Sequence, residues 1–320
     1  EVQGSPWAIP GDLILRHDIQ VLVDSGVINI PMTTWPLAWG DIAYNLSKTE
    51  KEMTSFELAS FHRIKQALLE EEIGGISANT SLKFAKNPET ITWFNDSVGA
   101  RSEIEGESTY LGKNFAINLH VNKKGGETLF DESYIAVALG DYSISLGSKK
   151  NWWGPGWGGS LILSTNANPI SGISIERNFS DPFESKLLHW VGPWDLSLLL
   201  GELEHSRTRS DALFFGMRIG SRPLTNLEIG FSKTSLFCGE NRPCGLSGFS
   251  DMLLDHTDSG YNLAGFDFRS SHHIKNFPFA LYGQIIGEEI SDNHLGLFGL
   301  ETWGPINDFN QSSVQFRAFL

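Results

Sequence analysis

The sequence predicts an antiparallel all-β fold, a transmembrane β-barrel that follows a small helical segment. Apolar and polar residues alternate over strand after strand from Thr80 onward, with Gly, Asn, Asp or Pro between the strands, a pattern typical of antiparallel sheets. Aromatic residues make up 12% of the chain and charged residues only 19%, which suits a barrel with aromatic girdles. No apolar run reaches the roughly 18–20 residues of a spanning helix, so we expect strands to cross the membrane.

The charge balance argues against nucleic acid as a partner. The chain has 24 Lys and Arg against 38 Asp and Glu, a formal net charge of -14, whereas nucleic-acid binding needs basic clusters. The mean hydropathy of -0.16 is compatible with a barrel, because barrel strands alternate apolar and polar residues. The first six residues have neither a basic flank nor an apolar core, so we expect the mature form of an exported protein.

Residues 1–79 are predicted to form a helical segment on the periplasmic side of the barrel. Leu15, Ile19 and Leu22 share one face of a helix that begins after Asp12, and Asp41 can cap a second, short helix. A third helix is expected to begin at Thr54 or Ser55 and to end at 74–75, with an apolar face of Phe61, Ile64, Leu68 and Leu69. These apolar faces are too narrow for spanning helices and wide enough to dock against the barrel.

Residues 80–320 are predicted to form the barrel, and the polar faces of its strands favour a membrane barrel over the alternative of a soluble sandwich or propeller. Charges of both signs, interrupted by Gly, collect on one face, while the opposite face is almost wholly Leu, Ile, Phe and Ala. This division suits a packed, charge-paired lumen inside a lipid-facing wall. We expect six residues to face inward and to pair with one another: Arg218, Asp267, Arg269, Gln284, Glu301 and Arg317.

Two cysteines, Cys238 and Cys244, are separated by a short polar stretch. Their spacing predicts a small-loop disulfide and therefore an oxidising compartment. Free thiols are the alternative, whereas two thiols alone do not complete a metal's coordination shell.

No catalytic motif is present, and we expect neither a metal nor a cofactor. The chain lacks a Gly-x-Ser-x-Gly elbow, a phosphate loop and a His-Glu-x-x-His zinc motif. Glu202 and Glu204 share a strand face about 7 Å apart, a spacing compatible with glycosidase carboxylates. Charge partners inside a filled lumen are the stronger interpretation of this pair.

The segment 149–157 is the candidate binding motif. Indole faces stack on sugar rings, while lysines bind carboxylates or hydroxyls, so the motif suits an acidic glycan. The candidate glycan contacts are Lys149, Lys150, Trp152, Trp153 and Trp157. An interfacial aromatic belt around a Gly-Pro-Gly turn is the alternative interpretation, and similar turns at 192–194 and 303–305 favour it.

Several strings, in a fixed order over nearly the whole chain, make it similar to the capsule assembly protein Wzi family. They lie at 5–8, 10–12, 24–28, 33–37, 152–157, 160–164, 188–194, 213–218, 263–267 and 281–284. The resemblance implies an outer-membrane barrel that holds capsular polysaccharide on the cell surface. It also implies more strands than the roughly fourteen for which this chain has room. Either the sequence is truncated at Leu320 or this is a shortened relative, and because open barrel edges in lipid are prohibitively costly, we expect truncation.

The resulting hypothesis is a non-enzymatic, lectin-like protein of the outer membrane that anchors capsular or extracellular polysaccharide. Polysaccharide and outer-membrane lipid are the expected partners, with capsule-export machinery as a candidate. The alternative, from a different functional class, is an outer-membrane channel for sugars or small solutes.

Overall fold

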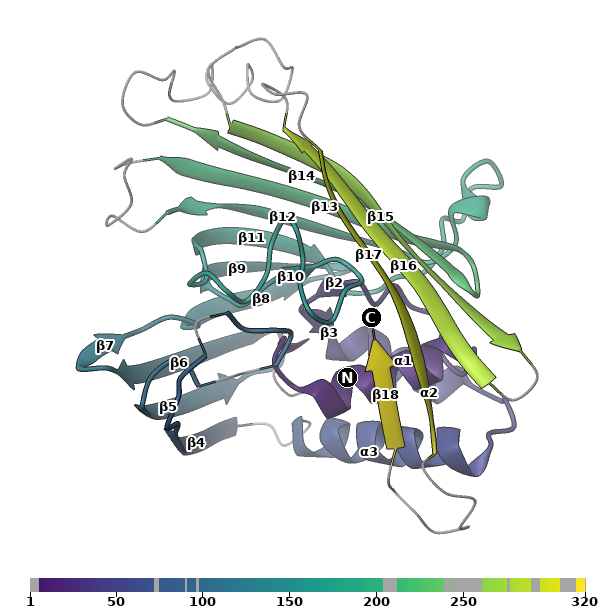
Figure 1. Cartoon of the computed structure of the whole chain (residues 1–320), viewed down its shortest axis with the longest axis horizontal. Helices are drawn as coiled ribbons and strands as arrows, with labels where there is room; N and C mark the ends of the chain where they lie inside the picture. The colour runs from purple at the N-terminus through teal and green to yellow at the C-terminus, as the bar shows by residue number, and fades with distance from the viewer. Residues whose placement is uncertain are drawn as a thin grey trace.

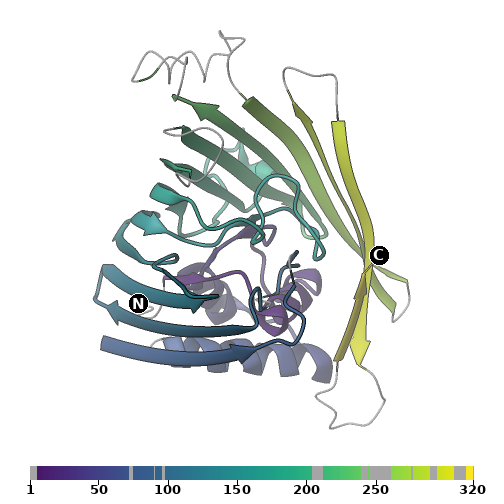
Figure 2. The same ribbon diagram turned by 60° about the vertical axis from the view of Figure 1, so that its left-hand side comes forward.

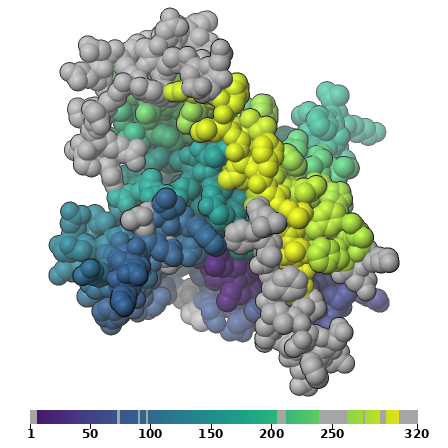
Figure 3. Space-filling view, in the orientation of Figure 1, coloured from purple at the N-terminus to yellow at the C-terminus, as the bar shows by residue number. Residues whose placement is uncertain are grey.

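A computed structural model shows one large, strongly curved antiparallel sheet with a helical segment held against its concave face (Figures 1 and 2). It describes residues 6–71, 75–89, 91–95, 98–203, 212–238, 244, 261–274, 277–288, 294–305 and 315–319. In the space-filling view the N-terminal segment, in purple, is visible between the first strands of the sheet in blue and the last strands in yellow (Figure 3).

The sheet has 14 strands among the described residues, as expected from the length of the chain. Their order is β18-β17-β16-β15-β14-β13-β12-β11-β9-β8-β6-β5-β4, and β7 pairs with β6 outside this path. The strands are β4 (Gly75–Phe84), β5 (Ser102–Leu111), β6 (Phe115–Lys124), β7 (Glu127–Leu129), β8 (Tyr134–Leu139), β9 (Tyr142–Ser148), β11 (Ser171–Arg177), β12 (Trp194–Glu202), β13 (Leu213–Leu224), β14 (Leu227–Phe237), β15 (Tyr261–Ile274), β16 (Phe277–Glu288), β17 (His294–Pro305) and β18 (Gln315–Phe319). All neighbours are antiparallel, as the alternation of the sequence predicts.

Three helices precede the sheet: α1 (Leu13–Asp24), α2 (Trp39–Lys48) and α3 (Ser55–Glu71). Helix α1 begins where the sequence predicts, because the Asp12 carboxylate accepts hydrogen bonds from the backbone of Ile14 and Leu15 at 2.8 and 2.9 Å. Helix α3 begins with a capping box, in which the Thr54 hydroxyl accepts from the Glu57 amide and the Glu57 carboxylate accepts from the Thr54 amide.

Two details of the helices and one strand boundary differ from the sequence-based expectations. Helix α2 begins at Trp39 without a side-chain cap, so Asp41 lies in its first turn rather than at the cap. Leu69 is 51% exposed, because the buried side of α3 follows Ser60, Ile64 and Leu68. Strand β4 begins at Gly75, five residues before Thr80, and residue 74 of the expected helix stop lies outside the described residues.

Short elements connect the helical segment to the sheet. Strand β1 (Trp7–Ala8) pairs with β3 (Leu37–Ala38), and β10 (Trp152–Trp153) pairs with β2 (Thr34–Trp35). A 3-10 turn, η1 (His189–Val191), lies between β11 and β12. Among the described residues, no helix has the length and apolar character needed to cross a membrane.

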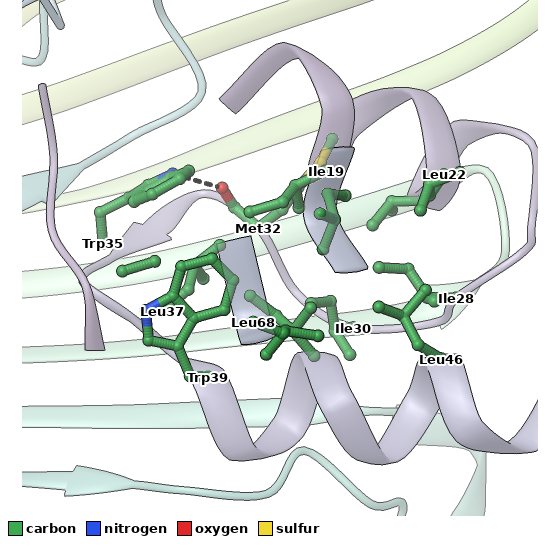
Figure 4. Close-up of a cluster of buried hydrophobic side chains, with 14 of the residues drawn as sticks. Ile19, Leu22, Ile28, Ile30, Met32, Trp35, Leu37, Trp39, Leu46 and Leu68 are labelled. Atoms are coloured by element: carbon green, nitrogen blue, oxygen red, sulfur yellow. Dashed lines mark hydrogen bonds between the residues drawn. The ribbon is translucent and has the colours of Figure 1, made fainter. Parts of the chain in front are cut away.

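The main hydrophobic core lies within the N-terminal segment rather than between sheets (Figure 4). It joins side chains of all three helices to the extended stretch 27–37, and the Trp35 indole N–H donates to the Met32 carbonyl at 3.0 Å. Phe94 and Trp152, from connections between sheet strands, complete this core. Because the core includes these two residues, the helical segment packs directly against the connections of the sheet.

The two faces of the sheet differ as the alternation predicts. The outward side chains are apolar and exposed, for example Ile229 at 42%, Phe266 at 69% and Phe298 at 64%. The inward side chains include Arg218, Glu228 and Glu301, each at most 2% exposed. Apolar outside and charged inside is the arrangement of a wall whose outer face contacts lipid.

Candidate functional site

The connections between strands differ in length between the two ends of the sheet. At one end, which we call the short-turn end, most connections are brief: 112–114, 140–141, 225–226 and 275–276. At the opposite end, the long-loop end, they are mostly longer: 85–101, 149–170, 203–212, 238–260 and 289–293. Helix α2 contacts the short-turn end, because Gly40 and Tyr44 lie against Phe179 in the connection after β11.

Buried ion pairs cover the inner face of β13 to β17. Both terminal nitrogens of Arg218 donate to the Asp267 carboxylate, at 2.7 and 2.9 Å. The Arg269 guanidinium contacts Glu301 at 2.5 Å and forms a bidentate pair with Asp24 at 2.5 and 2.8 Å. Such charges are tolerated away from water only when paired and hydrogen-bonded.

The structure brings together five of the six residues expected in the lumen. Arg218, Asp267, Arg269, Gln284 and Glu301 are all buried. They do not pair only with one another, because the N-terminal segment and the 149–170 connection supply further partners. Arg317 lies on β18 opposite Trp303, and its side chain lies outside the described residues.

The stretch 32–34 of the N-terminal segment is held directly against the wall. The Glu228 carboxylate accepts hydrogen bonds from the amides of Met32 and Thr33 at 2.9 and 2.8 Å, and from the Thr33 hydroxyl at 2.6 Å. Arg218 also donates to the hydroxyls of Thr33 and Thr34, each at 2.8 Å. One arginine therefore connects two barrel strands to the segment inside them.

The tryptophans of the candidate motif belong to the same interior. The Trp152 and Trp153 side chains are fully buried and Trp157 is nearly so. The Trp157 indole donates to Glu301 at 2.9 Å, and Gln284 donates to the Trp153 carbonyl at 3.0 Å. The connection 149–170 folds inward, because its backbone pairs with β2.

Arg16 of α1 joins the N-terminal segment to the connection 149–170. Its guanidinium donates to the carbonyls of Pro155 and Gly156 at 2.9 and 3.0 Å. It also lies over the rings of Phe94 and Trp157, at 4.2 and 4.5 Å from their centroids, as cation–π contacts require.

The expected glycan contact at this motif is therefore wrong for the three indoles and for Lys149. Stacking on a sugar needs an open ring face, and no open face remains on Trp152, Trp153 or Trp157. Lys149 is buried, pairs with Glu176 at 2.9 Å, and lies 3.5 Å from the centroid of the Trp7 ring. Lys150 differs, because its partly exposed side chain pairs with Glu132 and borders open space.

That open space consists of two adjoining hollows at the long-loop end, which we call the mouth cleft. The larger has a volume of about 500 Å³ and reaches the strand ends at Glu202, Leu236 and Glu288. The smaller has a volume of about 260 Å³. The residues that border both hollows are Asp131, Lys150, Thr165, Ala167, Asn168 and Pro169.

The smaller hollow is lined mainly by hydrogen-bonding side chains, including Glu103, Glu105, His120 and Asn122 on the inner face of β5 and β6. Carboxylates, amides and imidazoles in this density offer both donors and acceptors. A surface of this kind can replace the water around the hydroxyl groups of a sugar.

An exposed indole stands beside this hollow, at Trp93. Its neighbours in the chain, Thr92 and Asn95, line the hollow, and Trp93 itself is 52% exposed. The next residue, Phe94, points the opposite way into the buried core, and the Thr165 hydroxyl donates to the Trp93 carbonyl at 3.1 Å. Trp93 was not among the residues predicted from the sequence, because a lone Trp in a connection has no pattern around it.

Among the described residues, no arrangement of side chains supports the carboxylate pair or a metal site. Glu202 is exposed at the end of β12, and Glu204 lies outside the described residues, so no geometry supports a carboxylate pair. The part of the chain that the structure describes contains no group of His, Cys, Asp and Glu arranged to hold a metal ion.

Comparison with known proteins identifies consistent relatives. Residues 77–297 match the family model described as capsule assembly protein Wzi. An uncharacterized 55.8 kDa protein in the cps region of Klebsiella pneumoniae is 28% identical over 300 residues, which cover 88% of this chain and 58% of that protein. The chain thus spans somewhat more than half the length of this relative.

A solved structure is also similar. It is Wzi of Escherichia coli, described as an outer-membrane protein involved in group 1 capsule assembly and as a carbohydrate-binding β-barrel. The TM-score is 0.80 at 29% sequence identity, and the match covers 92% of this chain and 70% of the other.

Proposed function

Because the chain belongs to the capsule assembly protein Wzi family, we propose that it is an outer-membrane, lectin-like protein that binds capsular or extracellular polysaccharide and holds it at the cell surface. The relative of known structure is a carbohydrate-binding barrel of the outer membrane. The apolar outer face and charged inner face of the sheet support the same location for this chain.

The two ends of the sheet support an orientation in the membrane. Outer-membrane barrels have short turns on the periplasmic side and longer loops outside the cell. The short-turn end, with helix α2 of the N-terminal segment against it, then faces the periplasm. The long-loop end, with the mouth cleft, faces the polysaccharide.

The observation that carries the binding proposal is the mouth cleft with Trp93 at its side. It combines an exposed indole, polar side chains that can bind hydroxyls, and a partly exposed lysine at Lys150. The indole can stack on the apolar face of a sugar ring, and Lys150, which is paired with Glu132, can donate to a sugar hydroxyl. No catalytic step is part of this proposal.

Replacing Trp93 by Ala tests the site. Binding of purified capsular polysaccharide, measured by isothermal titration with detergent-solubilised protein, should weaken by roughly 1–3 kcal/mol, the scale of aromatic stacking on planar ligands. The matched control is Trp190→Ala, because Trp190 is also exposed, at 68%, but lies in η1 at the short-turn end. Equal affinities for both variants and the wild type would exclude Trp93 from the site.

Partners other than the polysaccharide follow from the location. Outer-membrane lipid surrounds the apolar outer face. Capsule-export machinery remains a candidate partner, since the family is named for capsule assembly.

A further inference from the structure

A groove runs along the outer face of the sheet over β13 to β17. Its volume is about 890 Å³, and its apolar walls include Ile219, Phe231, Phe266, Phe268 and Ile285. The rings of Phe231 and Phe266 lie 5.0 Å apart and are tilted by 49°. The apolar lining of this shallow groove suits a flexible hydrocarbon chain.

Gly283 in β16 lies under two aromatic side chains of the outer face. A Cβ atom at Gly283 would lie 2.8 and 2.9 Å from the rings of Phe298 and Phe268, so both rings pack over the glycine. Both rings are exposed on their other sides. Gly283 and Phe268 border the groove, so one wall of the groove at this point is aromatic.

The exposure of the outward side chains changes along the strands at Lys233. Toward the short-turn end, Ile219, Ile229 and Phe266 are between 39% and 69% exposed. One step beyond Lys233 toward the long-loop end, the outward residues Phe215 and Asn262 are only 8% and 6% exposed. This burial is local to β13 and β15, because Leu200, the partner of Phe215 on β12, is 38% exposed. Lys233 itself lies four residues before the long-loop end of β14.

Lys233 is a cation on this outward face. It lies on β14 between Met217 and Ala264 of the neighbouring strands and borders the groove. Within the described ranges, no carboxylate forms a salt bridge with it. A lysine on the lipid side of a barrel is costly at the bilayer midplane and much less so near the interface.

Among the described residues, the nearby carboxylates of Asp267 and Glu288 belong to the inward face and form no salt bridge with Lys233. Asp267 borders the groove but points inward to Arg218. Glu288 borders it from the inward register of Gln284 and also lines the mouth cleft. His294 borders it on the outward face of β17.

We propose that this groove binds a phosphorylated lipid of the outer leaflet, with an acyl chain along the phenylalanines and a phosphate on Lys233. Basic side chains at the headgroup level bind anionic headgroups, and the long-loop end is the outer side of the membrane in the proposed orientation. The site rests on the proposed membrane location and is separate from the mouth cleft on the inner face.

Binding of lipid A, a phosphorylated glycolipid, to the detergent-purified full chain tests the site by native mass spectrometry. We expect saturable binding of lipid A and little binding of zwitterionic phosphatidylcholine. Lys233→Gln should weaken lipid A binding about tenfold or more, the value of a hydrogen bond to a charged group. Its matched control, Lys186→Gln, changes an exposed lysine in the connection before η1 and should bind like the wild type.

A second pair of variants tests the groove itself. Ala264→Phe should fill it and weaken binding several-fold, whereas Val137→Phe, on the outward face of β8, should not. Wild-type affinity for lipid A in both Lys233→Gln and Ala264→Phe would overturn the proposal, as would equal binding of phosphatidylcholine. Polysaccharide binding by Lys233→Gln should stay unchanged, so failure of the lipid site and failure of the glycan function remain distinguishable.

Discussion

Two buried guanidinium groups connect the inner face of the sheet to the segment that it encloses. Arg218 joins Asp267 to Thr33 and Thr34, and Arg269 joins Glu301 to Asp24. Replacing a whole buried pair by apolar residues is often neutral, but removing one partner leaves an uncompensated charge. The stability of the junction therefore depends on keeping the pairs complete.

Asp267→Ala should lower the free energy of unfolding by roughly 3–5 kcal/mol, because it leaves the buried Arg218 without its carboxylate. Urea unfolding in lipid vesicles, followed by tryptophan fluorescence, measures this change. The control is Glu184→Ala, which removes an exposed carboxylate from the connection before η1 and should change stability by less than about 0.5 kcal/mol. Equal effects of the two variants would show that the Arg218 pair is not needed.

Asp41 makes the folding stability of the helical segment depend on pH. Burial raises the pKa of the Asp41 carboxyl to about 6, and it outweighs the hydrogen bonds with Ser180, which lower that pKa. Because the unfolded carboxyl ionises near its ordinary pKa of 3.8, the folded chain binds more protons between about pH 4 and pH 6. Stability from this group therefore falls as pH rises through that window and is constant above it.

Asp41→Asn should remove that loss, so the wild type should lose roughly 2–3 kcal/mol between pH 4 and pH 7 relative to the variant. The measurement is the unfolding free energy at a series of pH values. Glu50→Gln changes an exposed carboxylate that does not contribute to the shift at Asp41, so it is the control and should keep the wild-type slope. A variant whose stability follows the wild type across the window would contradict the assignment.

At the scale of single residues, the alternation of apolar and polar residues along the strands predicted side-chain positions better than the 149–157 motif did. The period of two places Arg218, Asp267 and Glu301 on one face, and the structure has them on the inner face. Their partners could not be predicted, because Asp24 and Arg269 are separated by 245 positions in the sequence. Contacts at that separation depend on the path of the chain, which no local pattern specifies.

Among the elements, helices with a side-chain cap were the easiest to place. Asp12 and Thr54 satisfy the first amides of α1 and α3, and both helices begin as predicted. The connection 149–170 was the hardest, because its tryptophans fit both a surface motif and an interior one. Its inward course depends on pairing between β10 and β2, two strands of two residues each that leave no periodic signal.

The disulfide between Cys238 and Cys244 is present at the end of β14. Alkylation of the denatured, unreduced protein should therefore modify no cysteine, and reduction should expose both. The loop is short, so its loss should lower stability by only about 2 kcal/mol in the chain-entropy model. Stoichiometric labelling before reduction, detected by mass spectrometry, would rule out the bond.

For the whole molecule, composition and alternation predicted the antiparallel wall and its polarity. The placement of the first 71 residues inside its curve follows from tertiary contacts rather than from helix-forming patterns. Their core includes Phe94 and Trp152 from sheet connections, so the segment and the barrel stabilise each other.

This filled interior predicts the absence of steady conductance. The N-terminal segment and the inward connection meet at Arg16, with hydrogen bonds to Pro155 and Gly156, and occupy the space through which solutes would pass. Protein inserted in planar bilayers should give no sustained open steps, with an open porin as positive control. Steady, reproducible channel currents would instead support the transport function considered from the sequence.

The central claim is polysaccharide binding, and a glycan array probed with the detergent-purified protein tests it most directly. We predict saturable binding to one or more capsular or extracellular polysaccharides, and weaker binding of strongly acidic polymers, because the carboxylates of the mouth cleft outnumber its lysines. Absence of binding to every polysaccharide, by protein that retains its heat-stable barrel, would contradict the account.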